Sequence, residues 1–199
     1  MTRKNIIIKE IINWIFIILG AFLLTSLVNS KVFARVQVQQ SSMENTLYSS
    51  QQLIVDKLSY NFESPKRGDI IIFLENEQRG TIMDDAILFA NNIKSLFKNT
   101  QKDNRLVKRV IGIPGDEVNI KDGYVYINGE KLKESYVKGE TFSGEINLPI
   151  KVPDNKLFVL GDNRPVSKDS RAFGLINSDQ VEGKAIFRVF PFNKIGAIK

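Results

Sequence analysis

An uncharged stretch of 18 residues, from Ile11 to Val28, constrains the fold of this chain more than any other feature of its sequence. Its length approaches the roughly 20 residues that a helix needs to cross the hydrocarbon core of a bilayer. The stretch is apolar on every side, whereas a helix that packs on a protein core keeps a polar face. The sequence therefore predicts a transmembrane anchor over residues 11–28.

The charges around the stretch predict its orientation. Arg3, Lys4, Lys9 and the amino terminus precede it, whereas Lys31 and Arg35 follow it. Positive residues favour the cytoplasmic side of a membrane. We expect a cytoplasmic segment over residues 1–10 and an extracytoplasmic domain over residues 29–199.

A cleavable secretory signal is the alternative to an anchor. Val32-Phe33-Ala34 offers small or aliphatic residues where such a signal is cut, so cleavage after Ala34 is open at this point. The apolar stretch is, however, longer than the roughly 7–15 residues of a typical signal. An uncleaved anchor is the favoured interpretation.

Composition excludes several kinds of site. The chain has no cysteine and no histidine, which excludes disulfides and cysteine ligands and argues against a zinc site. The net charge is +6, but no run of lysine and arginine is dense enough to favour nucleic acid. We expect no metal, no cofactor and no nucleic-acid partner.

Most of the remaining chain has the pattern of β-strands. Residues 35–39 alternate between polar and apolar, and residues 118–120 and 124–127 flank Lys121-Asp122-Gly123, a pattern typical of a hairpin. Short apolar runs follow the same logic at 53–55, 70–73, 156–160 and 185–190. The sequence predicts an all-β class, with an antiparallel sheet domain behind the anchor.

Residues 81–98 differ from this pattern. Their apolar side chains fall three or four residues apart, as on one face of a helix. We expect a short inserted helix packed on the sheet. An amphipathic element that lies on the membrane or on a partner is the alternative.

Lys108 lies within an apolar run, Leu106 to Ile111. In an extended strand Leu106, Lys108 and Val110 share one face, and Arg109 points to the other. Burial among apolar neighbours disfavours the ammonium form, so such a lysine can act as a base in a chain without histidine. The alternative is an exposed lysine on an edge strand.

Four segments in a fixed order carry a family resemblance. They are residues 41–47 (SSMENTL), 67–73 (RGDIIIF), 107–116 (VKRVIGIPGD) and 161–174 (GDNRPVSKDSRAFG). Together they resemble the type I signal peptidases, membrane-bound serine proteases that remove signal peptides from exported proteins. The short chain with one anchor resembles the Gram-positive subtype. The resemblance implies an antiparallel β fold of signal-peptidase type.

The resemblance also assigns roles to single residues. It implies that Ser42 is the nucleophile, that Lys108 is the general base and that Ser167 hydrogen-bonds and orients this lysine. Asp169 and Arg171 match a structural pair that supports the active-site strand. Taken alone, this pair is an ordinary surface ion pair and Ser167 a turn residue.

The oxyanion site departs from the family pattern. The backbone N–H of Ser42 is the expected first donor. Gln40 stands where family members usually have serine or glycine, and its amide can donate if it reaches the site.

By the same resemblance, the substrates are preproteins with small residues before the cleavage site, and the other partner is the lipid bilayer. We expect a monomer. One alternative is a self-cleaving Ser-Lys repressor, which would carry a helix-turn-helix domain where this chain has its apolar stretch. The other is a non-catalytic or dedicated assembly factor for pili or surface proteins on the same scaffold, which would be expected to have lost the nucleophile or the base.

Overall fold

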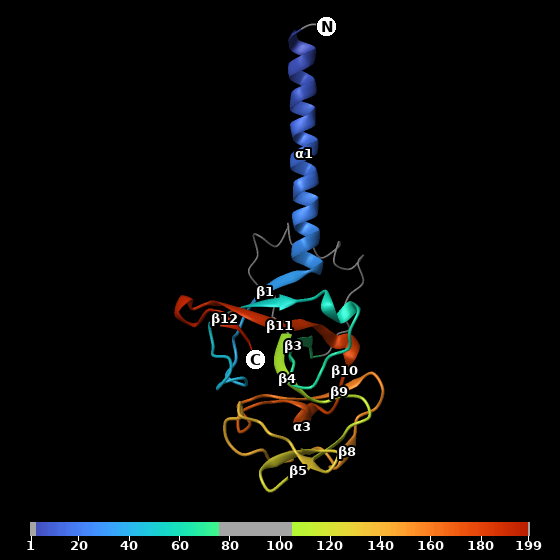
Figure 1. Cartoon of the computed structure of the whole chain (residues 1–199), viewed down its shortest axis with the longest axis vertical. Coiled ribbons are helices and arrows are strands. Elements are labelled where there is room, and N and C mark those ends of the chain that lie inside the picture. Colours follow the sequence, from blue (N-terminus) through green and yellow to red (C-terminus); the bar gives the residue numbers. More distant parts are fainter. Residues whose placement is uncertain (1–2, 76–104, 199) are drawn as a thin grey trace.

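The computed structural model describes residues 3–75 and 105–198 of the chain (Figure 1). The helices are α1 (Arg3–Lys31) and α3 (Ser170–Phe173), with 3-10 turns η1 (Ser59–Asn61), η2 (Ser178–Gln180) and η3 (Phe192–Lys194). The strands are β1 (Phe33–Gln37), β2 (Gln52–Asp56), β3 (Ile70–Leu74), β4 (Arg105–Gly112), β5 (Glu117–Lys121), β6 (Tyr124–Ile127), β7 (Glu130–Lys131), β8 (Ile150–Lys151), β9 (Lys156–Leu160), β10 (Ile176–Asn177), β11 (Val181–Phe190) and β12 (Gly196–Ala197).

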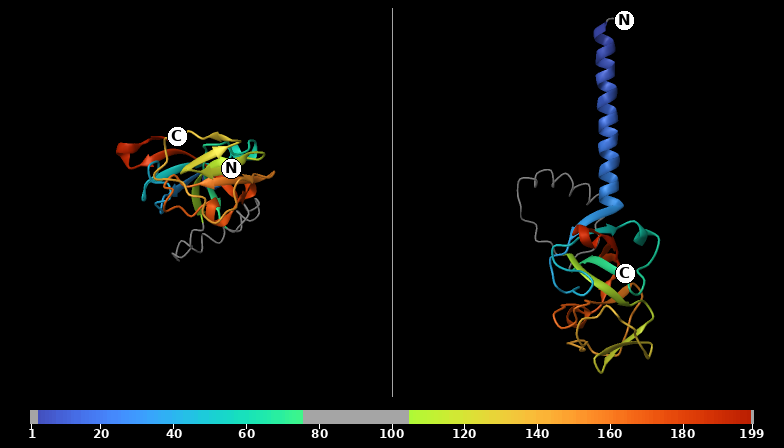
Figure 2. Two further views of the ribbon diagram at one scale, coloured as in Figure 1. Left: turned by 90° about the horizontal axis from the view of Figure 1, so that it is seen from below. Right: turned by 60° about the vertical axis from the view of Figure 1, so that its left-hand side comes forward.

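Two antiparallel sheets form the body. The larger sheet has the order β1-β2-β11-β3-β4-β9-β10, with β12 paired to β11, and the smaller one has the order β7-β6-β5-β8. Figure 2 shows the smaller sheet at the end of the body that is far from α1. A mostly antiparallel β fold with few helices is therefore confirmed.

The predicted hairpin over residues 118–127 is confirmed as β5 and β6. Lys121 pairs with Tyr124, so the loop consists of Asp122 and Gly123 alone. Both have positive φ, 52° and 82°, as a type I′ turn requires. The short-range turn chemistry is sufficient to set this register.

Helix α1 extends away from the body as one continuous element (Figure 1). Among the described residues, no helix combines the length and the hydropathy that crossing a bilayer demands. The helix predicted over residues 81–98 lies outside the described part of the chain.

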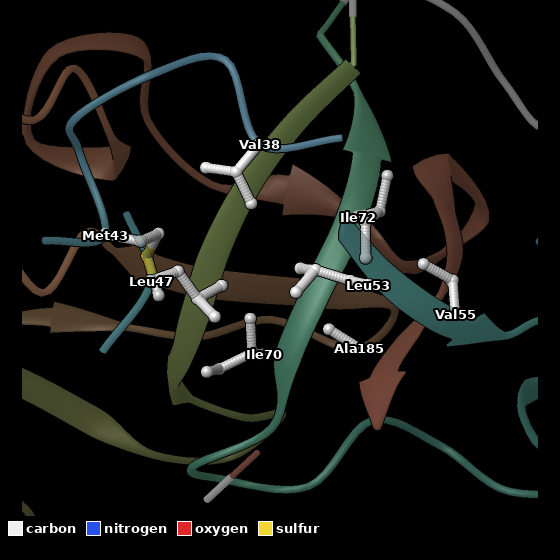
Figure 3. Close-up of a cluster of buried hydrophobic side chains, with 8 residues drawn as sticks. All are labelled: Val38, Met43, Leu47, Leu53, Val55, Ile70, Ile72 and Ala185. Atoms are coloured by element: carbon white, nitrogen blue, oxygen red, sulfur yellow. The ribbon is translucent and has the colours of Figure 1, made fainter. Parts of the chain in front are cut away.

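A hydrophobic cluster fixes the loop between β1 and β2 onto the larger sheet. Figure 3 shows the side chains of Val38, Met43 and Leu47 from this loop beside those of Ile70 and Ile72 from β3. Met43 and Leu47 are almost fully buried, which contributes about 2 kcal/mol each to folding. Ser42 directly precedes Met43 in this loop. The burial of Val38 and Met43 therefore fixes the position of Ser42 relative to the larger sheet.

Strand β4 shows the predicted alternation. Leu106 and Val110 pack in one cluster with residues of β3 and β9, while Val107 packs against the other cluster. Because β4 lies between β3 and β9, Lys108 is not on an edge strand, and it is only 1% exposed. The edge-strand alternative for Lys108 is wrong.

Candidate active site

The side chains of Ser42, in the loop between β1 and β2, and of Lys108, in β4, contact each other in a buried position. The Nζ atom of Lys108 lies 2.8 Å from the Oγ atom of Ser42 and donates a second hydrogen bond, of 3.1 Å, to the carbonyl of Val107. Ser42 is 7% exposed. A hydroxyl and an amine at this distance can exchange a proton directly.

Burial shifts the lysine toward its basic form. The low-dielectric surroundings lower the pKa of Lys108 from 10.5 to about 8, against the opposing effect of the charges of Asp169 and Glu75. At pH 7 roughly one amine in ten is then neutral. A strand lysine with an ordinary pKa near 10.5 would be neutral far more rarely.

The turn that carries Ser42 is held from behind by Asn163. The backbone N–H of Asn163 donates to the carbonyl of Ser42 over 3.0 Å, and its side-chain Nδ2 donates to the carbonyl of Ser41 over 3.1 Å. Sequence reasoning assigned no role to Asn163. It lies within the fourth motif segment, two residues after Gly161, which was the only indication available.

Gly161 of the fourth segment packs tightly against the nucleophile turn. A Cβ atom on Gly161 would lie 2.5 Å from the carbonyl oxygen of Ser42 and would clash with Oγ of Ser167. Only glycine therefore allows the two segments to pack at this distance.

Ser167 does not make the predicted hydrogen bond to Lys108. Its Oγ atom is buried and has no hydrogen-bond partner among the described residues, while its backbone N–H donates to the carbonyl of Asn163. The hydroxyl lies within reach of Gly161 and so borders the site. Its orienting role stays a prediction.

Asp169 and Arg171 form a buried pair rather than a surface one. Arg171 donates to both carboxylate oxygens of Asp169 over 2.8 Å each, and Asp169 is fully buried. The same carboxylate accepts the backbone N–H of Gly161 over 3.0 Å. The pair thus fixes the segment that packs on Ser42, and the alternative of an exposed ion pair is wrong.

A second buried pair, Arg109 with Asp162, was missed from the sequence. Arg109 donates to Asp162 through Nε and Nη2 over 2.9 and 2.7 Å, and the hydroxyl of Thr46 donates to the same carboxylate. Both charged residues are at most 2% exposed. The pair joins β4 to the far end of the nucleophile turn. In the sequence, Arg109 directly follows Lys108 in the third motif segment, and Asp162 directly follows Gly161 in the fourth.

Gln40 lies at the mouth of the site. It is exposed, and it lines a small pocket of about 40 Å³ together with Ser42, Met43, Arg105, Val107 and residues 36–39. Within residues 3–75 and 105–198, neither the amide of Gln40 nor the backbone N–H of Ser42 has a hydrogen-bond partner. Gln40 and Ser42 thus line the same pocket beside the nucleophile.

Metal-binding side chains do not gather here. Over the described ranges, no three acidic residues come close enough to hold a metal ion, and the chain contains no histidine or cysteine.

A family model matches most of the chain, and the relatives and solved structure described next carry the same name. The family described as "Signal peptidase, peptidase S26" matches residues 11–190. A signal peptidase IB of Staphylococcus aureus (strain COL) is 33% identical over 202 residues, which cover 94% of this chain and 93% of the relative. A probable signal peptidase I-2 of Synechocystis sp. (strain ATCC 27184 / PCC 6803 / Kazusa) is 36% identical over 81% of this chain and 65% of its own length. A crystal structure of a signal peptidase I from Enterococcus faecalis V583 has 33% sequence identity and a TM-score of 0.43, and covers 61% of this chain and 97% of its own.

Proposed function

Because the chain belongs to the signal peptidase family, peptidase S26, we propose that it is a membrane-anchored serine endopeptidase that cleaves signal peptides from exported preproteins with a Ser-Lys dyad. One observation carries the proposal. The only amine near the hydroxyl of Ser42, among the described residues, is that of Lys108 at 2.8 Å, and burial lowers the pKa of this amine to about 8.

The proposed reaction has two stages. Oγ of Ser42 attacks the scissile carbonyl while its proton passes to the neutral Nζ of Lys108. The resulting ammonium then donates that proton to the leaving amine, which departs and leaves an acyl ester on Ser42. In the second stage Lys108 takes a proton from water as the water attacks the ester, and the ammonium then returns this proton to Oγ of Ser42 as the carboxyl product leaves.

Two donors are candidates for the oxyanion site. The backbone N–H of Ser42 lies at the attacking residue itself and lacks a partner among the described residues. The amide of Gln40 lies in the same pocket and is the second candidate. Each donor that points at the developing oxyanion contributes roughly 3 kcal/mol of transition-state stabilisation.

Three further residues, Ser167, Asp169 and Arg171, support this dyad in the proposal. We assign to Asp169 and Arg171 the task of fixing Gly161 against Ser42. We assign to Ser167 the task of holding Lys108 once the amine is protonated. An ammonium has three N–H donors, and among the residues that the structure describes Nζ bonds only to Ser42 and Val107.

We also propose that α1 anchors the chain in the membrane over residues 11–28, with residues 1–10 cytoplasmic and residues 29–199 extracytoplasmic. Trp14, Phe16 and Ile18 are 64–67% exposed and their neighbours Ile15 and Ile17 are 56–59% exposed, so residues 14–18 present large apolar side chains on every side of the helix. Apolar surface of this extent is stable in lipid rather than in water. Strand β1 begins directly after α1, which keeps Ser42 near the bilayer surface.

The groove beside Ser42 supports a peptide substrate in extended form. Residues 36–40 and the start of β4 line this groove. A substrate segment can add as a strand along such backbone, with small side chains in the confined pocket. The membrane-embedded apolar part of a signal peptide then places its cleavage site at the depth of Ser42.

Incubation of the purified full-length protein with a preprotein, in detergent or in liposomes, tests the proposal. We expect one cut at the end of the signal peptide by the wild-type protein and none by Ser42→Ala or Lys108→Ala. Cleavage that survives in either variant would exclude the dyad. Failure of the wild-type protein on several preproteins would favour the non-catalytic assembly factor.

A further inference from the structure

The segment that follows β7, residues 134–141, reaches from the smaller sheet to the back of the active site. The backbone N–H of Lys138 donates to the carbonyl of Asp162 over 2.8 Å, and the N–H of Arg164 donates to the carbonyl of Lys138 over 3.0 Å. A parallel bridge also joins Lys138 to Asn163. This segment therefore lies alongside the residues that hold the nucleophile turn.

Arg164 connects this segment to Gly161. It is 1% exposed and is one of the largest fully buried side chains of the described residues. Its guanidinium donates to Glu134 over 2.5 Å, to the hydroxyl of Thr141 over 2.5 Å and to the carbonyl of Gly161 over 3.0 Å. Its bonds to Glu134 and Thr141 thus reach the 134–141 segment, and its bond to Gly161 reaches the residue that packs against Ser42.

Both backbone polar groups of Gly161 are hydrogen-bonded to buried side chains. Its N–H donates to Asp169, and its carbonyl accepts from Arg164. Because the space between Gly161 and the carbonyl of Ser42 does not admit even a methyl group, a movement of Gly161 is passed directly to Ser42.

Tyr136 makes a second connection from the same segment. Its hydroxyl donates to Glu134 over 2.9 Å, its ring lies 3.8 Å from the guanidinium of Arg109, and its carbonyl accepts the side-chain amide of Asn45 over 3.0 Å. Burial and the charge of Glu134 raise the pKa of Tyr136, so the phenol stays a donor to the carboxylate. Glu134 is therefore the common partner of Arg164 and Tyr136.

We propose that Glu134, Tyr136 and Arg164 are positioning residues of the peptidase, which set through Gly161 and Asn45 the position at which Ser42 meets Lys108. None of them touches the reacting atoms. The inference deepens the proposed function and rests on it for its kinetic readout. It assigns the smaller sheet a part in catalysis, because residues 134–141 extend directly from it.

The test compares Glu134→Gln and Tyr136→Phe with a matched control. Glu134→Gln keeps the size of the side chain and removes its charge, and Tyr136→Phe removes one hydrogen bond and keeps the ring. The control is Glu63→Gln, which breaks an exposed ion pair with Lys66. All proteins are assayed as full chains in detergent, at a temperature where each is folded by circular dichroism.

We expect Glu134→Gln to lower kcat on a preprotein roughly tenfold or more, with KM within about threefold, since misplacement of the nucleophile affects the chemical step. Tyr136→Phe should act in the same direction and less strongly. Glu63→Gln should stay within about twofold of the wild-type protein. A stability loss with unchanged kcat in both test variants would overturn the proposal.

A second readout does not depend on activity. The pKa of Lys108, followed by NMR titration of its labelled Cε, should rise in Glu134→Gln from about 8 toward 10.5, because a displaced turn admits water to the amine. Asp169 and Glu75 are the charges that act on this pKa, and Glu134 is not among them, so removal of its charge alone predicts no change. An unaltered pKa in both variants would also overturn the proposal.

The two readouts separate the possible failures. If Glu134→Gln does not fold, Tyr136→Phe decides by the same criteria. If the wild-type protein cleaves no preprotein, the proposed function fails while the titration still tests the positioning role.

Discussion

The amine of Lys108 and the hydroxyl of Ser42 lie 2.8 Å apart although 66 residues separate them in the chain. Lys108 is fixed by its place in the middle of the larger sheet, between β3 and β9. Ser42 lies in a turn whose neighbours Met43 and Leu47 are buried in the cluster of Figure 3. The contact thus joins a rigid strand to a turn held by packing, which favours a preorganised dyad.

The first prediction concerns the pH dependence of cleavage. Because the reactive form of Lys108 is the neutral amine and its pKa is about 8, kcat/KM should rise about tenfold per pH unit below pH 8 and level off above it. Initial rates on a preprotein between pH 5 and 10 measure this. A flat profile over that range would contradict a lysine base.

The second prediction is that Lys108→Met stabilises the folded protein while it abolishes cleavage. The pKa of Lys108 is 10.5 in the unfolded chain and about 8 in the folded protein. This difference means that burial of the charged form lowers the free energy of unfolding by about 3 kcal/mol. Below pH 8 both states are protonated and the folded state carries the full cost. Between pH 8 and 10.5 the unfolded state binds more protons, so wild-type stability rises with pH.

Denaturant unfolding of the wild-type and Lys108→Met proteins checks this at two pH values. At pH 7 the variant should gain up to about 3 kcal/mol, and the gain should shrink toward zero as the pH passes 10.5. Equal stability at pH 7 would mean that the amine is hydrated rather than buried.

The third prediction is that Gly161→Ala is damaging. The added methyl group would meet the carbonyl of Ser42 at 2.5 Å and the hydroxyl of Ser167, so the nucleophile turn has to move. We expect a loss of about 1–3 kcal/mol of stability and a large fall in kcat. Gly196→Ala is the matched control, because nothing lies within 4 Å of its added atom. Similar behaviour of the two variants would refute the close packing.

The fourth prediction concerns trimming after Ala34. Ala34 and Arg35 lie in β1, paired with Val55 and Ile54 of β2, so the bond between them is not available as an extended free segment. Mass spectrometry of the folded protein after long incubation should show an intact N-terminus. Accumulation of a fragment that begins at Arg35 under native conditions would show that this pairing opens readily.

Elements governed by neighbouring residues could be predicted from the sequence. The hairpin at Asp122-Gly123, the alternating faces of β4 and the antiparallel β class follow from side-chain periodicity and turn chemistry, which act over a few residues. The motif segments also supplied Ser42, Lys108, Asp169 and Arg171 through family resemblance. The structure places all four in one buried region.

Sequence alone determined which chemistry this chain has available: a serine and a lysine in a chain without histidine or cysteine. Only the tertiary structure decided how they are held. The bonds of Asn163 to Ser42, of Asp162 to Arg109 and of Glu134 to Arg164 join different parts of the chain. No local pattern specifies such pairs, because a buried charge is stable only beside the partner that folding brings to it.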